Sequence, residues 1–399
     1  MSVVGNQQQV FLGLLRQLRP HWHSDAALPA RIQRLLAADR RFGSRDRRLY
    51  RELIYTALRY LPWIEPDLDQ EAARAVKTVA WLAAETRDTR AFRAETAGDW
   101  TGLPSLAARA EFLGRSASDL LPGWFREHCP EVFAPAELEA QLARAPLWIR
   151  LQTEDPTPVT REFATQDWRT QASGEIPGAW KVLAEADLTK STAYQRGQIE
   201  IQDLGSQMVL ESLGIAPGER WLDACAGAGG KTLQLSQRVG AGGQVDAHDI
   251  RTEALDELLA RAERAGAENI RIASQPADSA YAGVLVDAPC SGSGTWRRSP
   301  HLKWTTTPAT ITERSALQLK LLRRFSTCVQ PGGRLVYATC SLSHHENAAV
   351  VRAFLANQGS FVAEPPQRTF GFAPRDEGLT ILPARHDTDG FFVVCLRRC

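Results

Sequence analysis

Apolar residues near the start of the chain recur at the spacing of one helix face. The first such stripe covers residues 11–18, and a second covers residues 50–61. Ser44 can cap the start of the second helix, and Pro62 can end it because the residue before a proline leaves the helical region. These patterns predict an all-α domain over residues 1–130.

The pattern changes after this domain. Residues 148–151 have the composition of a β-strand, and more short apolar runs lie between turns that contain proline or glycine. Residues 197–203 alternate apolar and polar side chains, as a half-buried strand does. We therefore expect a small α/β module over residues 131–200.

Over residues 201–399, short apolar runs alternate with helical stretches. We expect strands near residues 220–223, 244–249, 270–272, 284–286, 335–337 and 391–396. Strands separated by helices favour a parallel, doubly wound sheet, which is the Rossmann-like architecture. The predicted fold class is thus multidomain, and its largest part is an α/β domain.

Composition restricts the class of protein further. The 399 residues are 44% hydrophobic and carry a formal net charge of +1, as in ordinary globular proteins. The first residues lack the apolar core of a signal peptide, and no apolar run is long enough to cross a bilayer. The seven cysteines show neither Cys-x-x-Cys pairs nor zinc-site spacing. We expect a cytoplasmic monomer with reduced thiols and no metal.

Positive charge is concentrated in one segment of the helical domain. Residues 31–59 hold nine arginines against three acidic residues, which gives a net charge of +6. Clustered arginines suit a phosphate-rich partner such as RNA. A solvated helical face with local ion pairs explains the same pattern, so charge alone leaves both interpretations open.

Two cysteines each follow a predicted strand. Cys290 ends an Asp-Ala-Pro-Cys motif that begins at Asp287, and Cys340 lies in a Thr-Cys-Ser motif at residues 339–341. Ligand sites of open α/β sheets lie where parallel strands end. Two thiols and a carboxylate at that edge predict covalent catalysis on a ring that is attacked and later released.

A glycine-rich loop at residues 223–232 links the first strand of the α/β domain to its helix. A P-loop would need glycine at Cys225, and a dinucleotide-binding loop would need it at Thr232. Asp249 ends the next strand, about where a carboxylate binds a ribose diol. A ribose-bearing ligand with a carboxylate suits S-adenosylmethionine (SAM).

The same residues suggest the atom that is methylated. Cytosine C5 takes a methyl group only after a thiolate has added to C6, and a group that holds N3 assists this addition. Asp287 is placed to hold that nitrogen, and Cys290 is available for the release step. Ser343 and Glu346 fit a capping box, whose helix would begin just after Cys340 and favour its thiolate.

Together, these motifs resemble those of the RNA cytosine-5 methyltransferases, most closely the RsmB (Sun) type that modifies small-subunit ribosomal RNA. The likeness runs from about Gly197 to the C-terminus, with the motifs in the family's order. Upstream, the run Ser-Arg-Asp-Arg-Arg at residues 44–48 resembles the NusB-like helical domain of such enzymes. The resemblance implies a class I SAM-dependent methyltransferase fold and ribosomal RNA as partner.

The resemblance also implies roles for single residues. It makes Cys340 the nucleophile and Cys290 the residue that assists release, whereas in DNA enzymes the cysteine after proline attacks. It implies a cofactor site formed by Cys225, Ala226, Gly227, Ala228, Gly229, Gly230, Lys231, Asp249, Asp278 and Asp287. It allows RNA contacts from Arg45, Arg47, Arg48, Arg297, Arg298 and Lys303.

Three residues depart from the family pattern. Ala228 replaces a proline of the loop, and Ser299 and His301 replace the histidine and aspartate of an Arg-Arg-His-Pro-Asp stretch. The last two changes concern the RNA target more than the chemistry. Two other functions stay open: a ribosome-assembly or RNA-binding factor without turnover, and a DNA cytosine-5 methyltransferase. The two cysteines and Asp287 argue against the first, since binding alone does not need them.

Overall fold

The computed structural model describes residues 2–100, 102–375 and 377–399. The chain forms two compact units: Met1–Arg144 with Thr295–Pro308, and Ala145–Gly294 with Ala309–Cys399. This division differs from the predicted one, which placed boundaries after residues 130 and 200. The helical unit extends to Arg144, and the small α/β module shares a unit with the large sheet.

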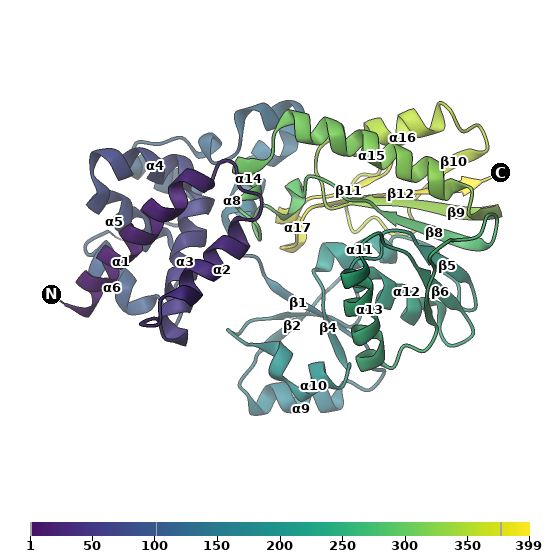
Figure 1. Cartoon of the computed structure of the whole chain (residues 1–399), viewed down its shortest axis with the longest axis horizontal. Coiled ribbons are helices and arrows are strands. Elements are labelled where there is room, and N and C mark those ends of the chain that lie inside the picture. Colours follow the sequence, from purple (N-terminus) through teal and green to yellow (C-terminus); the bar gives the residue numbers. More distant parts are fainter. Residues whose placement is uncertain (1, 101, 376) are drawn as a thin grey trace. The chain divides into compact units, whose positions relative to one another are not determined.

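The first unit is helical, as the apolar stripes predict (Figure 1). Gly43, and not Ser44, caps α3, and Pro62 lies in the first turn of α4, so α3 ends before it. The likeness to NusB stays a prediction. The helices are α1 (Val3–Leu18), α2 (Leu28–Ala38), α3 (Ser44–Arg59), α4 (Leu61–Gln70), α5 (Ala72–Leu82), α6 (Arg90–Ala97), α7 (Leu106–Leu113), α8 (Pro135–Leu142) and α14 (Leu302–Thr305).

The segment Thr295–Pro308, which contains α14, belongs to this helical unit although it follows the Cys290 motif in sequence. Trp304 Nε1 donates to the carbonyl of Leu58 at 2.7 Å, and Lys303 Nζ donates to the carbonyl of Arg59 at 2.8 Å. The last carbonyls of a helix lack donors from the helix itself, so these side chains cap the C-terminus of α3. This capping holds the segment in the helical unit.

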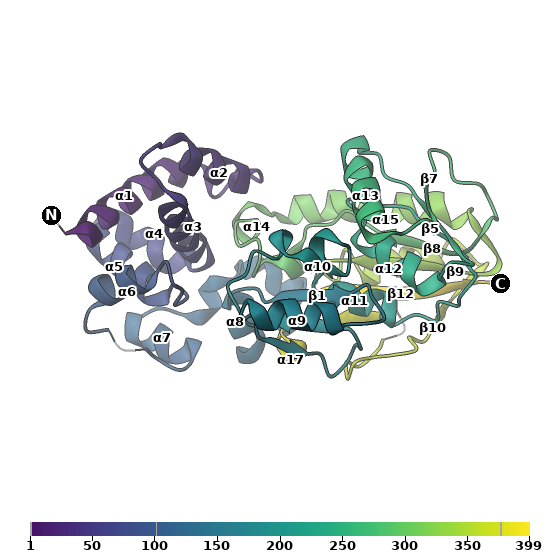
Figure 2. The same cartoon turned by 90° about the horizontal axis from the view of Figure 1, so that it is seen from below.

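The second unit begins with a small antiparallel sheet of strand order β2-β3-β1-β4. Helices α9 and α10 lie beside it (Figure 2). Its core contains Ile149, Val159, Phe163 and Ile199. The elements are β1 (Leu147–Leu151), α9 (Thr157–Thr165), β2 (Thr170–Ala172), β3 (Ala179–Val182), α10 (Thr192–Gln195) and β4 (Ile199–Ile201).

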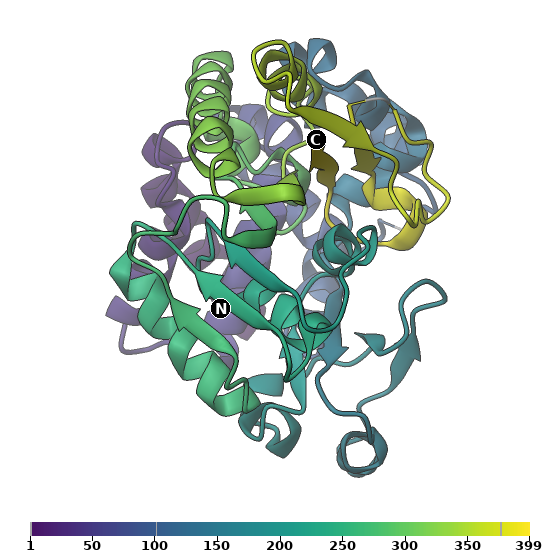
Figure 3. The same ribbon diagram turned by 90° about the vertical axis from the view of Figure 1, so that its right-hand side faces the viewer.

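The large sheet has the strand order β10-β12-β9-β8-β5-β6-β7, with β11 paired to β12. Figure 3 shows the chain from the side that lies to the right in Figure 1, with the last strands in yellow. Strands β5 to β9 pair in parallel, as predicted. Strands β10, β11 and β12 pair antiparallel, which corrects the expectation of a wholly parallel sheet. The strands are β5 (Arg220–Asp223), β6 (Gln244–Ala247), β7 (Ile270–Ile272), β8 (Tyr281–Asp287), β9 (Val329–Thr339), β10 (Phe361–Glu364), β11 (Leu379–Ile381) and β12 (Phe391–Arg398).

Helices cover both faces of this sheet because alternate strand residues point to opposite sides. On one face, Leu285 and Val336 pack with residues of α11 and α12. On the other, Val284 and Tyr337 pack with residues of α15 and α16. The helices are α11 (Leu204–Glu211), α12 (Gly230–Val239), α13 (Thr252–Ala265), α15 (Pro308–Ser326), α16 (Ala348–Leu355) and α17 (Pro383–His386).

Among the described residues, no helix combines the length and the apolar character that a membrane span requires.

Candidate active site

The carboxyl ends of β5, β8 and β9 bring the predicted site residues to one edge of the sheet. These strands are neighbours and run in parallel, with Asp223 beside Leu285 and Asp287 beside Ala338. The glycine loop follows β5, the Cys290 motif follows β8 and Cys340 follows β9. The edge therefore joins a loop that can cradle a ligand to two thiols and a carboxylate.

The two cysteines meet at this edge. Cys290 Sγ and Cys340 Sγ lie 3.4 Å apart, and both residues are partly exposed free thiols. The hydrogen bond with Cys340 and burial raise the pKa of Cys290 well above its ordinary value. The two sulfurs therefore share a hydrogen bond in which either can be the donor.

Lys231 adds a cation to the site. Its Nζ donates to Asp287 Oδ2 at 2.8 Å and lies 5.1 Å from the ring centre of Phe391. Burial alone would lower the pKa of Lys231, but the attraction of Asp287 outweighs burial and the pKa is raised. The sequence indicated Lys231 only as part of the cofactor loop, whereas the structure pairs it with the carboxylate beside the cysteines.

Glu346 connects the two cysteine loops, a role that the sequence did not reveal. This fully buried carboxylate accepts from the Ser291 N–H at 2.8 Å and from the Ser341 hydroxyl at 2.6 Å. The Ser291 hydroxyl and Gln318 Nε2 donate to it at 2.5 Å and 3.0 Å. Since Ser291 follows Cys290 and Ser341 follows Cys340, one side chain fixes the spacing of both thiols.

The predicted capping box is therefore wrong. Glu346 points to the serines and Gln318, and α16 begins only at Ala348 with Asn347 as its N-cap residue. Residues 341–347 are all described and form no helix, so a helix N-terminus does not favour the Cys340 thiolate there. The sequence does contain the Ser-x-x-Glu pattern, but the carboxylate of Glu346 accepts hydrogen bonds from residues distant in sequence instead of from the backbone N–H of Ser343.

The glycine loop has the backbone geometry of a ligand cradle. Gly227 has φ +52° and its N–H donates to Asp249 Oδ2 at 2.8 Å. Burial would raise the pKa of Asp249, but hydrogen bonds from Arg251 and Gly227 prevail and lower it. Asp249 is thus a charged acceptor beside the loop, as a ribose diol requires.

Asp223 offers a second acceptor to a ligand. Its Oδ2 accepts from the Thr232 hydroxyl at 2.8 Å, while its buried Oδ1 has no hydrogen-bond partner among the described residues. A buried carboxylate oxygen without a donor is costly unless a ligand supplies one. The loop, Asp249 and this oxygen together fit SAM, which carries a ribose diol and an ammonium group. When bound there, SAM supplies an electrophilic methyl group.

We expect Gly229→Ala to weaken SAM binding and to destabilise the protein. Gly229 has φ +90°, and an added Cβ would lie 2.7 Å from Leu258 Cγ. Positive φ alone costs a non-glycine residue about 1–3 kcal/mol, and the clash adds to this. Calorimetric titration with SAM and urea unfolding measure both effects. Gly240→Ala is the matched control, because Gly240 has φ +66° but open space around its Cα; equal losses in both variants would contradict the role of the loop.

The free energy of unfolding should depend on pH through Asp223. Burial raises the pKa of this carboxyl to about 7, whereas an unfolded aspartate titrates near pH ~3.9. The folded state therefore binds the extra proton between these values, and the group's stabilising contribution falls as pH rises from about 4 to 7, by at most about 4 kcal/mol. Urea unfolding of wild type and Asp223→Asn at several pH values tests this. An equally steep pH dependence in the variant would contradict it.

Asp278 does not lie at the site. It precedes β8, its carboxylate is exposed, and its Oδ1 accepts from the Thr327 hydroxyl at 2.5 Å. Thr327 itself precedes β9, so both residues lie at the opposite end of the parallel strands. The chain after β7 has already crossed the sheet when it reaches Asp278, and the predicted cofactor contact is wrong.

The residues predicted to bind RNA fall into two groups. Arg297 and Lys303 are buried inside the helical unit, with 0% and 1% exposure. Arg297 Nη2 donates to the carbonyl of Arg144 at 3.1 Å, and burial together with Arg59 lowers the pKa of Lys303 well below its ordinary value. Both serve packing here, which corrects the prediction of phosphate contacts.

The remaining predicted RNA contacts stay predictions. Arg298 is exposed. Arg45 and Arg48 are exposed on α3, but both face Asp88, at 3.9 Å and 2.6 Å. Arg47 is only partly exposed and lies on the same helix. His301, one of the departures from the family pattern, is buried in the helical unit.

A parallel sheet with a glycine loop after β5 and an acid after β6 is the architecture of the class I SAM-dependent methyltransferases. Residues 210–397 match the family model described as 16S rRNA methyltransferase RsmB/F. Over this region the chain belongs to the RsmB/F methyltransferase family, as its motifs predict. The family bears out SAM as the cofactor.

Relatives agree with this assignment. The probable ribosomal RNA small subunit methyltransferase B of Synechocystis sp. is 31% identical over 299 residues, which cover 69% of this chain and 66% of the relative. The corresponding Pasteurella multocida protein is 30% identical, over 70% of this chain and 65% of its own length. The chain thus matches just under two thirds of the length of these relatives.

Solved structures show a similar fold. The crystal structure of PH0851 has a TM-score of 0.75 at 21% identity and covers 100% of both chains. A methyltransferase homologue from Pyrococcus horikoshii has a TM-score of 0.60 at 24% identity, over 75% of this chain and all of that chain.

Proposed function

We propose that this protein is a SAM-dependent RNA cytosine-5 methyltransferase that acts on small-subunit ribosomal RNA. The observation that carries the proposal is the pair of thiols 3.4 Å apart, at the strand edge that also holds the glycine loop. Methyl transfer to a ring carbon needs a nucleophile that is later released, and a second thiol nearby suits that release. Ribosomal RNA as substrate is inferred from the relatives, which are ribosomal RNA small subunit methyltransferases B.

In the proposed reaction, Cys340 Sγ attacks C6 of cytosine as a thiolate. C5 of the resulting enamine would take the methyl group of SAM, whose bond to sulfur breaks so that S-adenosylhomocysteine leaves. C5 then loses its proton as the bond to Cys340 breaks. The family resemblance assigns the attack to Cys340, and the raised pKa of Cys290 supports this assignment because a protonated thiol is a poor nucleophile. The S–H of Cys290 can donate a hydrogen bond to the attacking sulfur. After it has released this proton to solvent, the sulfur of Cys290 can take the proton from C5, which restores its S–H.

Asp287 and Lys231 complete the proposed site. The carboxylate of Asp287 ends β8 and is held by the ammonium of Lys231 at 2.8 Å. A carboxylate there can accept from the exocyclic amine of cytosine, and the ammonium can supply a proton toward N3 during the attack. The target base has to be unpaired or flipped to reach the two sulfurs.

The experiment that tests the function is incubation of the protein with methyl-labelled SAM and unmodified small-subunit ribosomal RNA. We expect label in RNA, and bisulfite sequencing should place it on C5 of a cytosine. Label on DNA instead of RNA would favour a DNA methyltransferase. Binding of RNA without transfer of label to any RNA would favour an assembly factor without turnover.

A further inference from the structure

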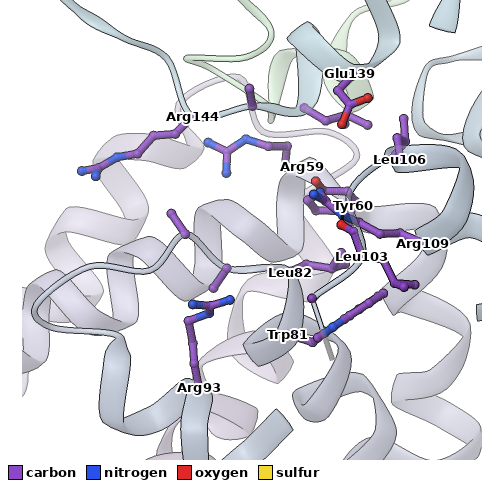
Figure 4. A pocket seen from close by; sticks show the side chains of 15 residues that line it. Arg59, Tyr60, Trp81, Leu82, Arg93, Leu103, Leu106, Arg109, Glu139 and Arg144 are labelled. Atoms are coloured by element: carbon purple, nitrogen blue, oxygen red, sulfur yellow. Dashed lines mark hydrogen bonds between the residues drawn. The ribbon is translucent and has the colours of Figure 1, made fainter. Parts of the chain in front are cut away.

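The helical unit contains a cavity of about 340 Å³ that has no part in the chemistry described above. Figure 4 shows its lining, in which arginines predominate among the charged side chains. The lining residues that matter for charge are Arg59, Arg93, Arg109, Arg144 and Glu139. All of them belong to residues 1–144, so the cavity lies wholly within this unit.

Arg59 is the least satisfied of these cations. It is 6% exposed, its Nε has no hydrogen-bond partner among the described residues, and its Nη2 reaches the carbonyl of Arg297 only at 3.4 Å. Burial and the nearby charges of Arg144 and Arg297 lower its pKa, and Glu52 is the acid that opposes them. A buried guanidinium in this state is costly unless an anion completes its hydrogen bonds.

The other charges around the cavity do not neutralise it. Glu85 pairs with Arg93 at 3.1 Å, and Glu52 lies 3.8 Å from Arg144. Arg90 also pairs with Glu85 at 3.3 Å, and Arg297 lies beside Arg59. Counting Glu52, Glu85 and Glu139 against these two arginines and the four that line the cavity leaves three positive charges among the described groups. Negatively charged oxygen acceptors are what the cavity lacks.

We propose that this cavity binds a phosphodiester group of the RNA substrate. The guanidinium fork matches two phosphate oxygens, and the negative charge of a phosphodiester offsets part of the positive excess around the cavity. This inference rests on the proposed function, because it takes RNA as the substrate. It also moves the expected RNA contact away from the exposed face of α3, where Asp88 already pairs with Arg45 and Arg48.

The test measures binding of a short, fluorescently labelled, single-stranded RNA of mixed sequence to the full chain, without SAM. Arg109→Gln with Arg144→Gln should weaken binding roughly tenfold and lower the slope of log affinity against log salt by about one per lost phosphate contact. Arg90→Gln is the control, because Arg90 is 74% exposed, pairs with Glu85 and does not line the cavity. Thermal melting of each variant confirms that it is folded.

Arg59→Lys is a second, independent variant. It keeps the positive charge but loses the planar guanidinium that can donate to two phosphate oxygens at once. We expect it to weaken RNA binding while the melting temperature stays near that of wild type. Unchanged affinity and salt slope in the folded pocket variants would overturn the proposal. So would a loss of binding in Arg45→Gln with Arg48→Gln while the pocket variants bind normally.

Inorganic phosphate distinguishes the source of the anion. If phosphate raises the melting temperature of wild type but not of the pocket variants, and RNA affinity is the same in both, the cavity serves a free anion and the RNA proposal fails. Methyl transfer is measured separately. Absence of transfer by wild type would refute the proposed function, whereas equal RNA binding by pocket variants of an active enzyme would refute the cavity alone.

Discussion

Cys340→Ala is expected to abolish methyl transfer, with a loss of at least about 10³-fold in turnover, because it removes the sulfur that bonds to C6 in the proposed reaction. The matched control is Cys399→Ala, which removes an exposed thiol far along the chain from both motifs. Transfer of labelled methyl groups to RNA measures the effect. Full turnover by Cys340→Ala would show that the attacking group has been assigned wrongly.

Cys290→Ala is expected to give a different defect from the same site. Attack by Cys340 remains possible, but release of the methylated base should slow, so enzyme and RNA stay covalently joined. A denaturing gel should then show a slow-migrating RNA–protein band that is absent for wild type and for a double variant lacking both thiols. If instead Cys340→Ala forms the band, the roles of the two cysteines are exchanged.

Glu346→Ala should have the second largest effect, on both stability and turnover. It leaves the Ser291 N–H and Gln318 Nε2 buried without this acceptor, and each unsatisfied group costs about 1–3 kcal/mol. The two cysteine loops also lose their common anchor, and a displacement of about 1 Å at reacting atoms can cost about 10²-fold in rate. We expect kcat to fall by that order while the KM for SAM changes little.

The variant Glu346→Gln distinguishes a role of Glu346 in positioning the two thiols from a role in the stability of the fold alone. The amide keeps one carbonyl acceptor, and the hydroxyls of Ser291 and Ser341 can rotate to accept from its amino group. This variant should therefore recover most of the unfolding free energy and part of kcat. Glu377→Gln is the control, since Glu377 pairs with Arg352 at 2.6 Å away from the site. If Glu346→Ala retains wild-type kcat in a folded protein, Glu346 does not position the thiols.

The sequence predicts the strands that carry the site, because their apolar runs are short and end in recognisable motifs. The topology of the sheet then determines where the site forms. Because β5, β8 and β9 are neighbouring parallel strands, the glycine loop and both cysteines lie at one edge of the sheet. Asp278 shows the limit of this reasoning. Its place depends on where the chain turns back after β7, and the short link to β8 leaves no pattern that marks the crossing.

Two other errors have the same physical origin, which is competition from residues distant in sequence. Glu346 does not form the predicted capping box, because its carboxylate accepts from buried donors of Ser291 and Gln318. Arg297 and Lys303 looked like a basic surface segment, but their donors satisfy carbonyls of the helical unit. The wrong prediction of strand direction has a different cause. Strands β10, β11 and β12 pair antiparallel, and the alternation of apolar residues in a sequence does not indicate strand direction.

The assignment of Thr295–Pro308 to the helical unit has a consequence for dissecting the molecule. A fragment that starts at Ala145 would retain Trp296 and Lys303 but would lose Phe125, Arg59 and Leu120, which cover or bind them. It would expose an indole ring and a formerly enclosed amine only a few residues from Cys290. One cut therefore cannot yield two clean halves, and a catalytic fragment has to be made by excising two stretches of the polypeptide.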